Sequence, residues 1–514
     1  MLGYLKPKNK AYKDDTGAHR VVSRRFLVSL LCTLAVLSLV ILFFRHSSLS
    51  VLSGLLALTI IWLGLLPGIL FLDGPKTRQI CLPLLSLVGV FYSVFFGLSA
   101  FLSHHLTFIP PEYTHSVTYI YDKMFYRTVS PVAQFTVISG LITMYVAHFG
   151  STKFLWRNLP SFSLPRRMDS KVLRVGIWIL LVAYLSYLYV PVIRLIPSIA
   201  QMVQPIGFLC FGGFYFLWKT DNLSRTQTIL VFLILFPLAW VKLILTGLLT
   251  PLLLYFIYFL ILEFWQSRKI PWVKILSALI VVGLIYPVMP KIRAHIWSPV
   301  NQISLLDTLE ERSRSLGKVF IFNEKPYAIR GCNACDSSAY QRQMLYSFRG
   351  LAQRISHISV LTVVVEVTPQ EVPFLNGESY RPLMTSMVPR LLWPDKPEER
   401  FGNTFGKRYG FLPVAENNTN SINTPWLTEM YANFGILGVI GGMFIVGFMI
   451  AGLERFLCHW TMSPFEQIIG ASILFPLFYQ DSNFSLMVGS LPLTVVTFWV
   501  FFKFVSFKSL FRYR

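Results

Sequence analysis

Basic residues are set among prolines and apolar side chains in the stretch from Tyr380 to Pro397. Arg381, Arg390 and Lys396 recur there, and the prolines break the stretch into extended or turn pieces. Arginine forks onto phosphate oxygens and lysine supplies a point charge, so this pattern favours phosphate binding. A structural role stays open, because the same cations can pair with three nearby carboxylates: Asp395, Glu398 and Glu399.

A second basic group lies upstream, at residues 341–358. Helical spacing places Arg342, Arg349 and His357 on one side and apolar residues on the other, with Arg354 at the edge of the apolar side. This amphipathic helix is either a basic wall for an anionic lipid-linked substrate or a helix lying on the membrane surface. In the second case its arginines face water or lipid headgroups.

Glu429 is a candidate carboxylate near the start of a long apolar helix. Thr424 followed by Pro425 fits an N-cap with proline at the first helical position. Such a helix N-terminus favours an anion, and Glu429 either acts on a substrate hydroxyl or only complements the helix dipole. Gly438 and Gly442 are four residues apart, which predicts close packing against another helix.

The sequence contains no P-loop, dinucleotide-binding, H-E-x-x-H or G-x-S-x-G signature. Cys332 and Cys335 form a C-x-x-C pair, but a structural zinc site needs four ligands and no second pair lies nearby. A local disulfide is the expectation for this pair outside the cell. Neither a cofactor nor a metal is expected.

The elements that position these residues are apolar. The 514 residues are 54% hydrophobic and 14% charged, whereas soluble domains carry about 25% charged residues. Apolar runs of about 20 residues match the thickness of a bilayer. We therefore expect an all-α polytopic membrane protein with ten or, more consistently, about twelve transmembrane helices, at 26–44, 49–72, 80–102, 131–149, 175–193, 199–218, 228–247, 249–265, 275–290, 431–452, 467–480 and 485–506.

Lysine and arginine concentrate in the loops on one side of this arrangement, which predicts that both termini are cytoplasmic. The same rule explains the net charge of +22 without nucleic acid. The chain then divides into a basic tail (1–25), transmembrane helices 1–9 (26–290), one large periplasmic loop with amphipathic helices (291–430), transmembrane helices 10–12 (431–506) and a basic tail (507–514). The large loop is the expected catalytic or substrate-binding region.

Five parts of the sequence resemble one known family: Phe374–Tyr380, Val388–Pro397, Tyr409–Gly410, Glu429–Gly435 and Gly438. They are similar to the O-antigen or oligosaccharide repeat-unit polymerases of the Wzy type. The resemblance implies a metal-independent, inverting glycosyltransferase of the GT-C class in the bacterial inner membrane. It would extend undecaprenyl-pyrophosphate-linked glycan on the periplasmic face.

Carried over, Arg390 and Lys396 match the family's P-R-x-x-W-P-x-K-P pattern, and Glu429 matches E-x-Y-x-N-F-G. The resemblance and the charge pattern of the loop together give Glu429 and Arg390 as candidate catalytic residues, beside substrate-binding candidates Arg342, Arg349, Arg354, Arg381, Lys396, Tyr409 and Asn423. The expected partners are the lipid-linked glycan, the bilayer, a chain-length regulator and a flippase. Three other functions stay open: an O-antigen ligase that transfers glycan to lipid A core, a flippase for lipid-linked oligosaccharide, and a non-enzymatic scaffold of a polysaccharide export complex.

Overall fold

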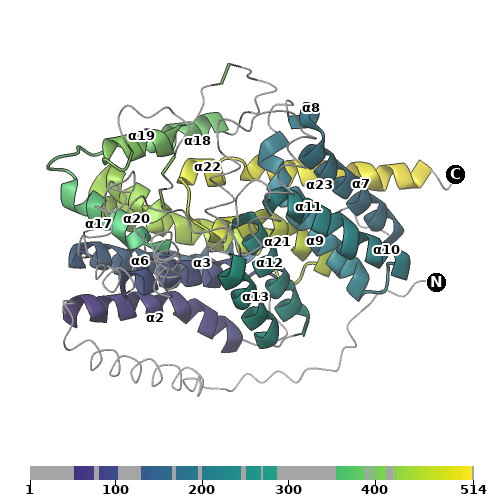
Figure 1. Cartoon of the computed structure of the whole chain (residues 1–514), viewed down its shortest axis with the longest axis horizontal. Coiled ribbons are helices and arrows are strands. Elements are labelled where there is room, and N and C mark those ends of the chain that lie inside the picture. Colours follow the sequence, from purple (N-terminus) through teal and green to yellow (C-terminus); the bar gives the residue numbers. More distant parts are fainter. Residues whose placement is uncertain are drawn as a thin grey trace, which may run out of the picture.

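The computed structural model describes residues 51–73, 80–101, 129–164, 170–194, 199–244, 250–267, 270–285, 355–386, 388, 393, 395–396, 400–412, 421–422 and 424–511. Regular structure in these residues is helical, without β-strands (Figure 1). The expected span at 26–44, the Cys332–Cys335 pair and most of the 291–430 loop lie outside the described residues.

Eight described segments are long and apolar enough to cross a membrane, so the chain is a membrane-embedded helical protein. They coincide with eight of the expected spans. Their helices are α2 (Val51–Asp73), α3 (Leu84–Tyr92) with η2 (Ser93–Leu98), α6 (Pro131–Phe154), α7 (Ser170–Tyr189), α10 (Arg225–Ile229) with η5 (Leu230–Leu235) and α11 (Phe236–Ile244), α12 (Thr250–Ser267), α20 (Trp426–Leu457), and α22 (Phe484–Val488) with α23 (Leu491–Phe511).

Three more expected spans coincide with helices outside this set of eight, so the described residues do not establish twelve crossings. These helices are α9 (Ile199–Lys219), α13 (Trp272–Ile285), and α21 (Pro464–Leu474) with η9 (Phe475–Phe478).

The helices pack in two groups joined by α21. Helices α2, α3, α6 and α20 lie together, α7, α9, α11 and α12 form the other group, and α21 contacts both α9 and α20 (Figure 1). Helices α6 and α20 approach each other closely, because a Cβ on Gly447 would collide with the carbonyl oxygen of Met144. Small residues allow this kind of approach between helices in a membrane.

Helix α20 is broken near its start. Phe434 (φ −142°, ψ 17°) and Gly435 (φ 64°, ψ −150°) are non-helical, and the positive φ of Gly435 favours glycine. A Cβ on Gly438 would lie 2.5 Å from the carbonyl oxygen of Met430, and one on Gly442 would lie 2.5 Å from the Met430 sulfur. These two glycines therefore make room for Met430 across the kink of their own helix, and the prediction of packing against another helix was wrong.

The start of α20 also differs from the expected cap. The helix begins at Trp426 and Pro425 is its N-cap residue, without a side-chain capping hydrogen bond. The prediction of Thr424 as the N-cap was therefore wrong by one residue. A proline at the cap position already has no N–H to satisfy.

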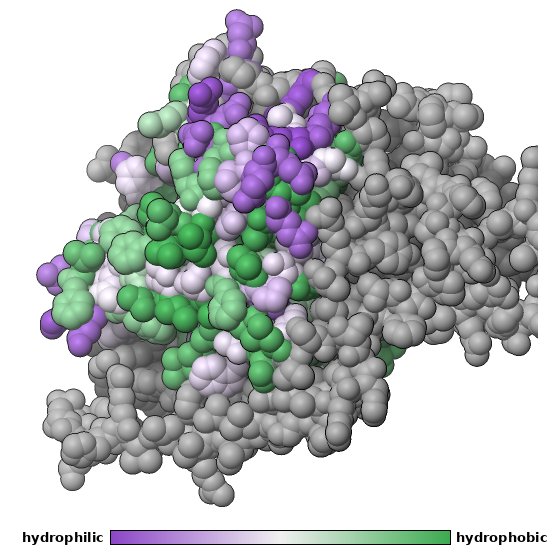
Figure 2. Space-filling model, turned by 90° about the vertical axis from the view of Figure 1, so that its left-hand side faces the viewer, coloured by the Kyte–Doolittle hydropathy of each residue, from purple (hydrophilic) through white to green (hydrophobic). Residues whose placement is uncertain are grey.

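A group of shorter helices lies near the first turns of α20. They are α17 (His357–Val367), η8 (Glu378–Tyr380), α18 (Arg381–Ser386) and α19 (Phe401–Arg408). Helices α17 and η8 contact α20, and α18 packs on η8 and α22. A second hydrophobic cluster, separate from the main core, joins α17 and α19 to α20 and is formed by Val360, Val363, Val364, Leu375, Phe405, Tyr409, Phe411, Leu412, Ile422 and Ala432. On the side of the molecule shown in Figure 2, hydrophilic residues gather at the top and hydrophobic residues lie across the centre.

The helix predicted at 341–358 overlaps the described residues only at its end. There α17 begins at His357, and residues 357–364 are all buried. His357 was expected on the polar, exposed side of an amphipathic helix, and that expectation was wrong. Its ring is enclosed by aromatic side chains from α3 and η2 instead.

Candidate functional site

The kink of α20 is the place where two distant segments of the chain meet. Just before the kink, the carbonyl oxygens of Ala432 and Asn433 lie where the regular helical pattern ends. They accept hydrogen bonds from the backbone N–H groups of Leu375 (3.0 Å) and Asn376 (3.3 Å). The loop at 375–377 therefore binds the carbonyl groups at the end of the first part of α20.

The side chain of Asn433 locks this loop in place. It is fully buried, and its Oδ1 accepts a hydrogen bond from the N–H of Gly377 (2.8 Å). Its Nδ2 donates to the hydroxyl of Ser379 and to the carbonyl of Glu429, both at 2.8 Å. A buried amide that uses both ends in this way specifies one arrangement of the loop.

Two glycines allow the loop and the kink to interdigitate. A Cβ on Gly435 would lie 3.2 Å from the ring of Phe374, and a Cβ on Gly377 (φ +85°) would lie 3.4 Å from the ring of Phe434. Both glycines have positive φ, and each faces an aromatic residue of the other segment. The two segments are thus built to fit one another.

Glu429 lies one turn before Asn433 and is fully buried. Its Oε2 accepts a hydrogen bond of 2.7 Å from the N–H of Phe484, the first residue of α22. A carboxylate in this position complements the partial positive charge of a helix N-terminus. The Phe484 ring lies edge-on to both Trp426 (4.8 Å) and Tyr380 (6.2 Å). Burial and the nearby Glu429 carboxylate raise the pKa of the Tyr380 hydroxyl.

A short non-helical segment, residues 479–483, separates η9 from α22 and carries further polar groups. Asp481 Oδ1 lies 2.9 Å from His357 Nε2, and Asp481 Oδ2 accepts a hydrogen bond of 2.9 Å from the Tyr479 hydroxyl. Gln480 is fully buried, and its Oε1 accepts a hydrogen bond of 2.9 Å from the Tyr92 hydroxyl. This segment therefore connects α3, α17 and, through Phe484, α20.

Residues 163–512 match a family model described as a domain of unknown function (DUF8712). This match covers more than half of the chain. The protein belongs to the DUF8712 family. No curated protein and no solved structure matches the chain.

The DUF8712 region, residues 163–512, contains most of the candidate site. It includes the loop at residues 374–379, which is called the docked loop below. It also includes the kinked start of α20, the segment 479–483 and His357. Helices α2, α3, η2 and α6 precede this region. Of these, α3 contributes Tyr92, and α3 and η2 contribute the aromatic residues around His357. The site is thus completed by a part of the chain outside the matched family region.

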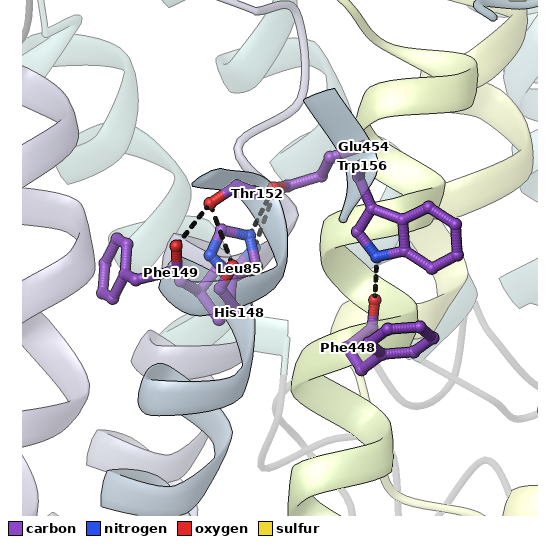
Figure 3. A network of polar contacts seen from close by, with 7 residues as sticks. All are labelled: Leu85, His148, Phe149, Thr152, Trp156, Phe448 and Glu454. Carbon is purple, nitrogen blue, oxygen red and sulfur yellow. Dashed lines mark hydrogen bonds and ion pairs between the residues drawn. The ribbon is translucent and has the colours of Figure 1, made fainter. Parts of the chain in front are cut away.

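A second, partly buried carboxylate lies near the other end of α20 (Figure 3). Glu454 Oε1 accepts a hydrogen bond of 3.0 Å from the N–H of Leu85, in the first turn of α3, and Oε2 lies 2.9 Å from His148 Nε2. Nearby, the Trp156 indole N–H donates to the carbonyl of Phe448 (3.1 Å). Glu454 therefore joins α3, α6 and α20, so each end of α20 has a glutamate bonded to the start of another helix.

The other candidate residues from the sequence are placed as follows. Arg381 begins α18 and is exposed, and the Lys396 ammonium donates to the carbonyl of Val388 (3.1 Å). Tyr409 is buried in the second hydrophobic cluster, where its hydroxyl is 3.0 Å from that of Thr368, and burial raises its pKa. Five candidates lie outside the described residues: Arg342, Arg349, Arg354, Arg390 and Asn423.

The structure thus brings Glu429 together with the loop that leads into Arg381. It also reveals groups that sequence reasoning missed, above all the His357–Asp481 pair and the buried Gln480. A signal for them exists, because Gln480, Asp481 and Asn483 interrupt two apolar runs. Among the described residues, no group of three or more His, Cys, Asp or Glu side chains is arranged to hold a metal.

Proposed function

We propose that this protein is a membrane glycosyltransferase that joins undecaprenyl-pyrophosphate-linked oligosaccharide repeat units into O-antigen, capsule or exopolysaccharide on the periplasmic face of the bacterial inner membrane. The observation that carries the proposal is the contact between the 375–379 loop and residues 429–433. These two segments resemble the Wzy-type polymerases in sequence. Their fit supports a common role, because segments far apart in the chain form one buried joint.

In the proposed reaction the basic residues bind the diphosphate of the lipid-linked donor. Arg390 and Lys396 follow Arg381 in the sequence, and Arg381 begins α18 just after the docked loop and η8. Cations fixed where negative charge grows on the leaving pyrophosphate lower the barrier for transfer. Arg342, Arg349, Arg354, Tyr409 and Asn423 complete the proposed binding set.

Glu429 has a positioning role in this proposal. Its carboxylate holds the start of α22 and lies next to Tyr380, whose hydroxyl stays protonated because its pKa is raised. A protonated phenol can donate a hydrogen bond to a sugar oxygen. Glu429 and Tyr380 together would orient the acceptor hydroxyl toward the donor.

Reconstitution tests the proposal. The purified protein is placed in liposomes with undecaprenyl-pyrophosphate-linked single repeat units, taken from a deletion strain in which these units accumulate. Longer glycans on undecaprenyl pyrophosphate are the expected product. Glycan on added lipid A core would indicate a ligase instead, and movement of the glycolipid across the bilayer without new bonds would indicate a flippase.

A substitution tests the diphosphate contact in the same assay. Arg390→Ala should keep normal membrane insertion and abundance but lose polymer by about 100-fold or more, the usual effect of removing one donor to a developing anion. Arg157→Ala, at an exposed arginine beyond the end of α6, is the matched control and should polymerise normally. Full activity of Arg390→Ala would remove Arg390 from the site.

A further inference from the structure

The proposed function leaves the proton of the acceptor hydroxyl without a named acceptor, and the structure holds an unused histidine–carboxylate pair beside the candidate site. His357 Nε2 and Asp481 Oδ1 are 2.9 Å apart, and their side chains are only 9% and 12% exposed. The Tyr479 hydroxyl donates to the other carboxylate oxygen at 2.9 Å. One oxygen of Asp481 therefore accepts a hydrogen bond, and the other lies at ion-pair distance from the histidine ring.

The pairing decides which ring nitrogen can accept a proton. A carboxylate oxygen 2.9 Å from Nε2 favours the tautomer with the hydrogen on Nε2, which leaves the lone pair on Nδ1. One ring face stacks on Phe95, with centroids 4.9 Å apart and planes at 14°. Within the described residues, Nδ1 has no hydrogen-bond partner. The Asp481 contact and the stacking thus favour one tautomer and one orientation of the ring, with Nδ1 uncommitted.

The pair lies close to the residues of the proposed site. Asp481 is three residues before Phe484, whose N–H is bound by Glu429. Three residues of extended chain span at most about 11 Å. Around His357 lie Asp481, whose other oxygen accepts from Tyr479, and the rings of Phe91, Phe95 and Phe96. The nearest carboxylate on α20 is Glu429, which is bonded to α22.

We infer that His357, oriented by Asp481, takes the proton of the acceptor hydroxyl in the proposed glycosyl transfer. This inference rests on the proposed function. As the acceptor oxygen bonds to the anomeric carbon of the donor sugar, its proton moves to His357 Nδ1. The bond between that carbon and the pyrophosphate oxygen breaks, and undecaprenyl pyrophosphate leaves with the electron pair. The imidazolium is balanced by Asp481 and returns its proton to water.

A purely structural ion pair between His357 and Asp481 would explain the same geometry. The test must therefore separate a structural role of His357 from its role as a proton acceptor. A structural pair would make His357→Ala inactive by disturbing the fold, whatever small base is supplied. A proton acceptor would make the variant responsive to the basicity of an added heterocycle that fills the space left by the ring. Imidazole, 4-methylimidazole and 1,2,4-triazole are similar in size and differ in basicity.

The experiment uses the full-length protein in proteoliposomes with the same glycolipid. His357→Ala should slow chain extension by about 100-fold or more, and the three heterocycles should restore the rate in the order of their basicity. Asp481→Asn, which keeps the side-chain shape, should slow the reaction at least tenfold while its melting temperature stays near that of the wild type.

Three outcomes overturn the inference: normal extension by His357→Ala, restoration that ignores basicity, or normal extension by a folded Asp481→Asn. Asp481→Asn keeps the inference open to refutation even when His357→Ala does not fold. A wild-type protein that makes no polymer overturns the proposed function itself, and the inference falls with it. An active wild type with active variants overturns only the inference.

Discussion

Replacing Asn433 by alanine tests the joint between the docked loop and α20. The substitution removes three hydrogen bonds of 2.8 Å, to Gly377, Ser379 and Glu429. Two of them join the loop to α20, each worth about 0.5–1.5 kcal/mol net, so the loop loses about 1–3 kcal/mol; the bond to Glu429 lies within α20. Because these bonds and the backbone bonds of Leu375 and Asn376 attach the loop to the first part of α20, we expect local opening of the loop rather than global unfolding.

Amide hydrogen exchange measures this opening directly. In a peptide covering residues 374–380, the N–H groups of Leu375, Asn376 and Gly377 are all bonded to residues 432–433. A loss of about 1–3 kcal/mol corresponds to exchange that is about five to 150 times faster. The protein is compared with the wild type in lipid nanodiscs, under conditions where exchange reports the opening equilibrium.

Ser379→Ala provides the graded control, because it removes only one of the three side-chain hydrogen bonds of Asn433. It should speed exchange of the same peptide by about tenfold at most. Peptides from α6 should keep their protection in both variants. Exchange of residues 374–380 that stays within threefold of the wild type in a folded Asn433→Ala protein would refute the reasoning.

Three further predictions follow from other parts of the structure. Gly435→Ala should lower the melting temperature of the purified protein, because alanine is strained at φ 64° and its Cβ would press on the Phe374 ring. Gly441→Ala is the control and should leave the melting temperature unchanged, because its Cβ would meet nothing within 4 Å. Glu454→Ala should cost about 1–3 kcal/mol in reversible unfolding, since it leaves the buried His148 ring and the Leu85 N–H without their partner, and a loss below about 0.5 kcal/mol would contradict this. Alkaline phosphatase fused after Arg390 should be active, because the proposed donor requires Arg390 on the periplasmic side. If only a reporter that works in the cytosol is active at this position, the proposed function is overturned.

Hydropathy was enough to predict much of the fold. Long apolar runs such as those of α2, α6 and α20 leave few alternatives to a membrane helix, and eight expected spans are confirmed by length and composition. The run at 467–480 was expected to be one span, but α21 ends at Leu474 and η9 ends at Phe478. The chain leaves the helix there because Gln480 and Asp481 bond to other elements, which a local pattern does not contain.

The site was predictable only as a set of sequence segments. Asn433 and Gly435 were recognised as letters of a motif, but their roles depend on a loop more than 50 residues earlier in the chain. His357 shows the opposite failure. Helical periodicity placed it on an exposed polar side, whereas the partner that buries it, Asp481, lies in another part of the sequence. Such contacts depend on tertiary structure, so spacing alone does not reveal them.

Glu429 and His357 have different roles in the proposed reaction and cannot easily exchange them. The Glu429 carboxylate accepts from the N–H of Phe484 at 2.7 Å, so taking up a proton would weaken the bond that begins α22. His357 can accept a proton at Nδ1 while Nε2 keeps its contact with Asp481, and the pair is then joined by opposite charges. We therefore propose that Glu429 positions the site and that His357 takes the proton. Glu429→Gln, which keeps an acceptor oxygen for Phe484, should retain far more polymerisation than His357→Gln, and the reverse order would place the base on α20.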